Sequence, residues 1–150
     1  MAICEGHSMT EHQSPVDIPP TAPVHRDGLQ LVYGTIPLVV GENPTAVQVD
    51  CTVDASITLD GREFCLEQFH IHCPSEHTFG GTHTPMAIHL VHRSADGAIA
   101  VVAVMFVEGA ANPVIGQLLG ALVGDDPHDI DLQALLPRDR AHVAYDGSLT

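Results

Sequence analysis

From Leu29 to Val107 the sequence is a succession of short apolar or β-branched runs, with clusters of turn residues between them. Runs of this length, separated in this way, are typical of β-strands. Two of them are joined by Asp60-Gly61, a dipeptide that favours a tight β-hairpin turn. The sequence therefore predicts six strands: Leu29 to Tyr33, Ala46 to Val53, Ser56 to Leu59, Glu63 to His72, Met86 to Arg93 and Ala98 to Val107.

One helix is expected after the last of these strands. Asn112 can cap its first turn, Pro113 suits the first helical position, and Gly124 follows its end. An apolar stripe at helical spacing would face the core. The stripe consists of Ile115, Leu118, Leu119 and Leu122. A short helical turn is expected over Asp131 to Leu136, just before a proline.

The rest of the chain bears on domain organisation. Residues 1–28 are rich in Pro, His and polar residues and show no clear period, which predicts an irregular N-terminal arm. A chain of 150 residues with 45% hydrophobic and 16% charged residues is typical of a globular domain rather than a disordered segment. We expect residues 1–150 to form a single, mostly β domain with a peripheral helix. Cys51 and Cys65 lie in apolar runs and are expected to be buried thiols.

The charge balance limits the partners of the chain. Five arginines, with no lysine, stand against 19 acidic residues, so the net charge is −14. Such a charge disfavours nucleic acid and anionic lipid as partners. No apolar run reaches the roughly 18 residues that a membrane-spanning helix needs. Residues 1–6 lack the basic start and apolar stretch of a secretory signal, so a cytoplasmic location is the default expectation.

Three histidines on two predicted strands form the candidate metal site. Side chains alternate between the two faces of a strand, so His70 and His72 share one face. His89 lies on the next long strand and can complete the set. Catalytic zinc takes three protein ligands and keeps one position open. The same His-x-His spacing occurs in cupin-like barrels, and a lone strand histidine is more often a hydrogen-bonded core residue, so spacing alone names no reaction.

The segment from Gln68 to His92 contains the motifs Q-F-H-I-H, P-S-E-H and H-L-V-H in this order. These motifs resemble the signature of the α-class carbonic anhydrases of bacterial type. Flanking segments extend the resemblance over nearly the whole chain: Gln13 to Ile18, Ala100 to Phe106, Leu135 to Pro137 and Tyr145 to Thr150. The resemblance implies a large, mainly antiparallel twisted sheet. It also implies zinc-dependent, reversible hydration of carbon dioxide to bicarbonate by zinc-bound hydroxide.

Carried over position by position, the resemblance also implies roles for individual residues. Zn2+ would be held by the three histidines already named, and Gln68 would orient His70. Glu76 would be a buried catalytic glutamate that accepts a hydrogen bond from the catalytic Thr150, and Tyr145 would support this network. The apolar wall for carbon dioxide would consist of Val91, Val101 and Leu149.

Departures from the family pattern weaken the expectation of full activity. Ala87 stands where the family has a glutamate that orients the third histidine, and Thr45 stands where it has a proton-shuttle histidine. The chain resembles a family member truncated at both ends, because relatives continue beyond Thr150 with strands that complete the sheet. We therefore expect an incomplete sheet whose exposed edges would let two copies pair as a homodimer. The alternative function is that of a zinc-binding relative with weak or no activity.

Overall fold

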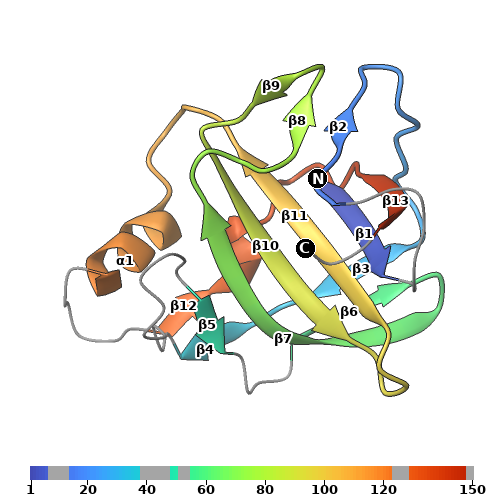
Figure 1. Cartoon of the computed structure of the whole chain (residues 1–150). Coiled ribbons are helices and arrows are strands. Elements are labelled where there is room, and N and C mark those ends of the chain that lie inside the picture. Colours follow the sequence, from blue (N-terminus) through green and yellow to red (C-terminus); the bar gives the residue numbers. More distant parts are fainter. Residues whose placement is uncertain (7–13, 38–47, 51–54, 123–128, 148–150) are drawn as a thin grey trace.

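The computed structural model of the whole chain describes residues 1–6, 14–37, 48–50, 55–122 and 129–147. The largest element in this part is a curled eight-stranded sheet (Figure 1). Its strands are β1 (Ala2–Gly6), β3 (Leu29–Val32), β5 (Gln48–Asp50), β6 (Ser56–Leu59), β7 (Arg62–His72), β10 (Met86–Arg93), β11 (Ile99–Phe106) and β13 (Val143–Gly147). They lie in the order β13-β1-β11-β10-β7-β6-β3, and β5 pairs with β7.

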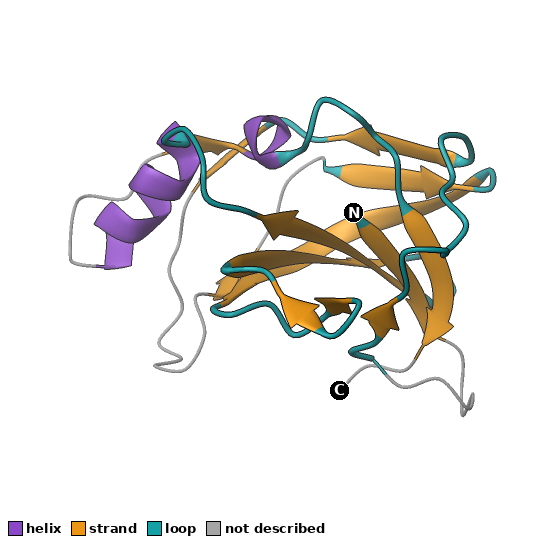
Figure 2. Cartoon of the chain, turned by 90° about the horizontal axis from the view of Figure 1, so that it is seen from above, coloured by secondary structure: helices purple, strands orange, loops and turns teal. Residues whose placement is uncertain are grey.

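Smaller elements surround the large sheet (Figure 2). A three-stranded sheet contains β2 (Asp17–Ile18), β8 (Thr78–Phe79) and β9 (Thr82–His83), and a two-stranded sheet contains β4 (Thr35–Pro37) and β12 (Asp129–Asp131). The helices are α1 (Pro113–Leu122) and the short 3-10 helix η1 (Leu132–Leu135). In the described ranges no helix has the length and hydropathy to cross a membrane.

The predicted fold class is confirmed. Five of the six predicted strands are described in full and agree with the structure to within one residue at each end. Of the sixth, Ala46 to Val53, the described residues 48–50 are a strand. Every strand pair is antiparallel except β1–β13 and β2–β8, so the sheets are mainly antiparallel. Asp60 and Gly61 both have positive φ, 49° and 82°, which is the conformation of the predicted hairpin turn.

The prediction of an irregular arm over residues 1–28 is wrong at its start. Ala2–Gly6 is a strand inside the sheet, next to its β13 end, antiparallel to β11 and parallel to β13. Ala2 and Ile3 are each only 1% exposed. The partners of Ala2 in these two strands are Ala103 and Val143, far away in the sequence, so local composition carries no sign of the pairing. β2 is a second strand in this segment.

The helix begins as predicted, but its buried face differs. Asn112 Oδ1 accepts hydrogen bonds from the backbone N–H groups of Val114 and Ile115, at 2.9 and 3.4 Å. Val114 and Leu118 are buried in the core, whereas Leu119 is 55% exposed. The prediction that Leu119 belongs to the core-facing stripe is therefore wrong. Residues 114 and 118 lie one helical turn apart, which places Leu119 on the solvent side. Gly124 lies outside the described residues.

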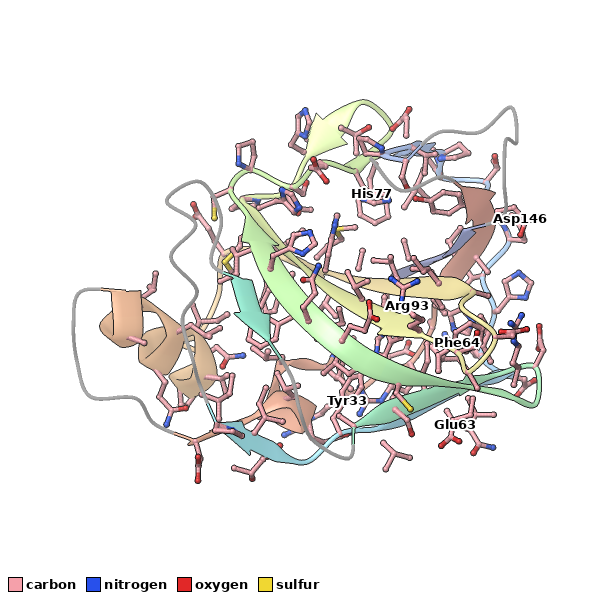
Figure 3. All side chains as sticks on the ribbon, turned by 60° about the horizontal axis from the view of Figure 1, so that its bottom comes forward. Tyr33, Glu63, Phe64, His77, Arg93 and Asp146 are labelled. Carbon is pink, nitrogen blue, oxygen red and sulfur yellow. The ribbon has the colours of Figure 1, made fainter. Side chains whose placement is uncertain are left out.

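A β-bulge in β7 decides which side chains reach each face of the sheet. The register with β10 slips at residue 67, because His92 pairs with Leu66 while Val91 pairs with Gln68. Before the bulge Phe64 points into the core and Glu63 outward (Figure 3). After the bulge the odd-numbered Phe69 is the buried residue. The bulge therefore shifts the core-facing positions of β7 from even-numbered to odd-numbered residues. Because of this shift, Phe69 packs in the same core as Phe64. Cys65 is exposed, so the prediction of a buried thiol there is wrong, and Cys51 lies outside the described residues.

The two faces of the sheet have different roles. One face packs against α1, η1 and the β4–β12 pair and forms the main hydrophobic core. The opposite face carries the histidines and a small apolar cluster of Ala2, Ile18 and Ala103. The path through the large sheet ends at β13 and β3. Pairing of two copies through such edges stays a prediction.

Candidate metal centre

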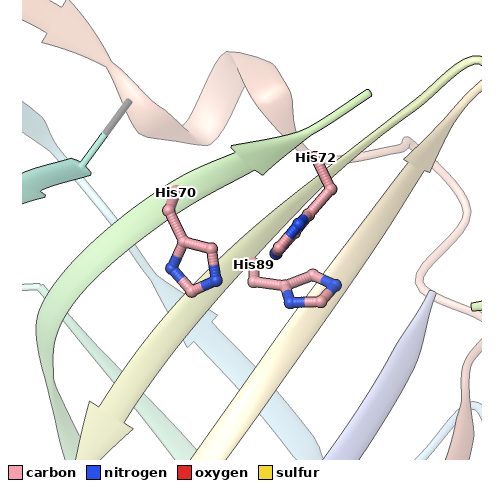
Figure 4. A group of neighbouring side chains, drawn as sticks. All are labelled: His70, His72 and His89. Atoms are coloured by element: carbon pink, nitrogen blue, oxygen red, sulfur yellow. The ribbon is translucent and has the colours of Figure 1, made fainter. Parts of the chain in front are cut away.

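Two adjacent strands bring the three predicted histidines together. His70 on β7 is the register partner of His89 on β10, and His72 follows two residues later on the same face of β7. The candidate ligand atoms of the three rings all lie within 4.8 Å of one another. Figure 4 shows the rings gathered over the same part of the two strands. The centroids of the His72 and His89 rings are 4.5 Å apart. The predicted convergence is therefore present in the fold.

The surroundings keep two of these rings uncharged at neutral pH. The pKa of His89 is lowered to about 3, mainly by burial and in smaller part by the neighbouring His72, His77 and His70. Burial is also the main reason why the pKa of His70 is lowered, and His72 adds to it. A neutral imidazole has a free lone pair that can bind a metal, whereas a protonated ring has none. These two rings are therefore ready to bind a metal without first losing a proton.

Hydrogen bonds and unpartnered nitrogens show that the site fits a metal. His70 Nδ1 donates to Gln68 Oε1 at 2.8 Å, which leaves Nε2 as the lone-pair nitrogen of that ring. Two further nitrogens, His72 Nε2 and His89 Nε2, are buried without a hydrogen-bond partner. Buried polar atoms in proteins nearly always have a partner. Three imidazoles, each able to offer one ring nitrogen, match the donor set of a zinc site.

Glu76 lies beside the histidines. Its Oε2 is 3.3 Å from His72 Nε2 and 3.8 Å from His89 Nδ1. Its side chain is 36% exposed, which differs from the buried glutamate that the resemblance implies. The predicted partner Thr150 and the predicted wall residue Leu149 lie outside the described residues, so the bond between Glu76 and Thr150 stays a prediction.

The predicted apolar wall begins at Val91, two residues after His89 on the same face of β10. Val91 is the register partner of both Gln68 on β7 and Val101 on β11. Val91 is buried and Val101 is half-buried. Two β-branched side chains side by side exclude water from this part of the sheet. The arrangement gives the histidine cluster an apolar border next to Gln68.

A hydrogen-bonded chain next to His89 was missed by sequence reasoning. His77 Nε2 and Tyr145 Oη are 2.7 Å apart, and Tyr145 Oη and Ser14 Oγ are 2.5 Å apart. His77 is 3% exposed, and its ring centroid is 5.4 Å from that of His89. These hydrogen bonds join three segments that are distant in the sequence. Tyr145 thus contacts the histidine region through His77, while its predicted support of the network of Glu76 and Thr150 stays a prediction. Ser14 and His77 lie within the motifs quoted above, which was the signal that could have pointed to them.

Comparison with known proteins gives the family. The sequence model described as eukaryotic-type carbonic anhydrase matches residues 2–150. This chain belongs to that family. The α-class resemblance is thereby confirmed, and the cupin-like alternative is excluded. A carbonic anhydrase of Klebsiella pneumoniae is 40% identical over 147 residues, which are 93% of this chain and 60% of that protein. One of Pectobacterium atrosepticum is 39% identical over 156 residues, 99% of this chain and 62% of the relative.

Solved structures support the same family. The α-carbonic anhydrase of Photobacterium profundum has a TM-score of 0.72 and 29% identity, covering 91% of this chain and 76% of its own. That of Thermovibrio ammonificans, solved with the inhibitor sulfanilamide, has a TM-score of 0.73 and 26% identity, covering 91% of this chain and 74% of its own. The chain spans about three fifths of the length of the two bacterial relatives named above.

Ala87 explains why His89 Nε2 has no partner. Ala87 is fully buried on the same strand face as His89, two residues away, and its methyl group accepts no hydrogen bond. We expect the carboxylate of Ala87→Glu to accept a hydrogen bond from His89 Nε2–H, which leaves Nδ1 of that ring for the metal, and to raise zinc affinity about 10-fold, the lower end of what such partners contribute. Competition with a chelator at neutral pH measures the change. Ala87→Leu, which adds volume but no acceptor, is the control, and equal affinities of the two variants would contradict the explanation.

Proposed function

We propose that this chain binds one zinc ion through His70, His72 and His89 and catalyses the reversible hydration of carbon dioxide to bicarbonate. The observation that carries the proposal is the convergence of three imidazoles whose ligand atoms lie within 4.8 Å of one another. Membership of the carbonic anhydrase family names the reaction. When bound, zinc supplies the charge that lowers the pKa of water from 15.7 to about 7, as is known for carbonic anhydrases.

The residues of the chain would hold and orient the parts of the reaction. Gln68 accepts the Nδ1–H of His70 and so fixes which nitrogen of that ring faces the metal. Val91 and Val101 would form the wall against which carbon dioxide rests, because an apolar molecule is favoured next to apolar side chains. Thr150 would donate a hydrogen bond to Glu76, and Leu149 would extend the wall. Tyr145 would help to hold His77 beside His89 through the hydrogen bond described above.

Stopped-flow hydration of carbon dioxide tests this proposal. The chain is first stripped of metal with a chelator and then loaded with one equivalent of zinc. We expect the loaded protein to accelerate hydration and the stripped protein to give the rate of buffer alone, with activity returning on renewed loading. A loaded protein that is no faster than the stripped protein would refute the catalytic part of the proposal.

A zinc-binding protein of weak or no activity is the second candidate function. The specific observation in its favour is the unpartnered Nε2 of His89 beside Ala87. Loss of such a partner costs about 10–100-fold in metal affinity or activity. One bound zinc per chain, together with hydration at the rate of buffer alone, would favour this candidate over the enzyme.

A further inference from the structure

The two ring nitrogens of His89 lie in different surroundings. His89 Nδ1 and His72 Nε2 lie 3.8 and 3.3 Å from the same oxygen, Glu76 Oε2, so these two nitrogens face a common space. The other nitrogen of His89, Nε2, is buried without a hydrogen-bond partner. When Nδ1 of a neutral ring offers its lone pair, the hydrogen is on Nε2, which is then a donor in need of an acceptor.

His77 offers an acceptor beside this ring. Its side chain is buried, and its ring plane is at 76° to that of His89, with the centroids 5.4 Å apart. His77 Nδ1 is also buried without a hydrogen-bond partner. Centroids at this distance allow facing ring nitrogens to approach within hydrogen-bond range. Because buried polar atoms nearly always have a partner, two such atoms on adjacent rings point to each other as partners.

The hydrogen bonds on the far side of His77 suit this role. His77 Nε2 is 2.7 Å from Tyr145 Oη, which is 2.5 Å from Ser14 Oγ. A hydroxyl group can donate one hydrogen and accept another. When His77 Nε2–H donates to Tyr145 and the Tyr145 hydroxyl donates to Ser14, both hydrogens are used and His77 Nδ1 keeps its lone pair. This direction of the hydrogen bonds makes His77 Nδ1 an acceptor.

We propose that His77 is the positioning residue of His89: His89 Nε2–H donates to His77 Nδ1 when the site holds zinc, which keeps His89 Nδ1 directed at the ion. The χ2 torsion of histidine is broad, so small turns of the two rings make this bond. The inference rests on the zinc site of the proposed function. It gives His89 an acceptor that the methyl group of Ala87, fully buried two residues earlier on β10, does not supply. A neutral acceptor is weaker than a carboxylate, so Ala87→Glu is still expected to gain affinity.

A double-mutant cycle on zinc affinity tests the inference. We expect His77→Phe to lower the zinc affinity of the parent about 10-fold, measured by competition with a chelator, because the acceptor is lost. In the Ala87→Glu background the new carboxylate takes the His89 Nε2–H, so the same substitution should lower the affinity by less than about 2-fold. A merely structural role for His77 would cost the same affinity in both backgrounds, and equal losses would overturn the inference. His25→Phe is the control, since His25 is exposed and outside the cluster, and it should leave the affinity unchanged in both backgrounds.

The position of the hydrogen on each ring gives a second measurement, which needs no substitution at His77. Nitrogen-15 NMR of the zinc-loaded parent, labelled at histidine, distinguishes a ring nitrogen that carries a hydrogen from one that carries a lone pair. We expect the hydrogen of both His77 and His89 to be on Nε2. A hydrogen on His77 Nδ1 would overturn the inference, even if His77→Phe does not fold, while the proposed function stands on its own hydration assay. If the parent binds no zinc, the inference and the proposed function both fall.

Discussion

Replacing His89 by alanine is expected to lower zinc affinity by more than about 100-fold and to reduce carbon dioxide hydration to the rate of buffer alone. The loss should exceed the roughly 10–100-fold that removal of a supporting partner costs, because a ligand itself is removed. His89 lies on β10 between β7 and β11 and is 7% exposed, so the sheet holds its ring in place beside the other two. Two remaining histidines leave the zinc site one ligand short.

The stability of the protein gives a second measurement of the same change. A ligand that binds only the folded state stabilises it by about 2.7 kcal/mol when its free concentration is 100 times Kd. We expect zinc to raise the free energy of unfolding of the parent and to leave that of His89→Ala unchanged at the same concentration. His25→Ala is the control, because His25 is exposed and outside the cluster. Equal stabilisation of parent and His89→Ala by zinc would show that the metal binds elsewhere.

The strands of the sheet could be predicted where the pattern is local. Met86–Arg93 and Ser56–Leu59 are bounded by turn residues, and both were predicted with their observed bounds. Ala2–Gly6 and Val143–Gly147 are strands because they pair with each other and, through β1, with β11. Their short sequences show no alternation long enough to read, so this part of the sheet depended on contacts across most of the chain.

The candidate site could be predicted to a similar degree. Strand alternation placed His70 and His72 on one face, and a neighbouring strand supplied His89, as the register confirms. What alternation cannot give is the partner of each polar atom. The position of Glu76 beside His72 depends on the fold of the segment after β7, and the bond from His77 to Tyr145 depends on packing across the sheet.

His92 is a buried histidine on the opposite face of β10 from His89. It is fully buried, its Nε2 accepts the hydroxyl hydrogen of Tyr33 at 2.7 Å, and its Nδ1 donates to the Ala100 carbonyl at 3.2 Å. Both nitrogens are thus used by the neutral ring. Burial lowers the pKa of His92 to about 4, although the backbone hydrogen bond to Ala100 opposes the shift. Protonation would break the bond from Tyr33 and place a charge in the core.

The metal-free protein is therefore expected to lose stability as the pH falls from 6.5 towards 4. Above pH 6.5 the His92 ring is neutral in the folded and the unfolded protein, so it does not change the free energy of unfolding with pH. Below pH 6.5 the unfolded chain binds a proton at His92 that the folded protein excludes. A depression of the pKa from 6.5 to about 4 corresponds to a loss of about 3 kcal/mol at the acid end of this window.

Urea unfolding at several pH values, with chelator present so that zinc release adds nothing, measures this loss. His92→Gln keeps a donor and an acceptor without titrating, so its free energy of unfolding should fall less steeply over the same window, while His25→Gln should follow the parent. If the difference between parent and His92→Gln were independent of pH, the acid sensitivity would have to arise from the other buried histidines, His70, His77 and His89, whose pKa values burial also lowers.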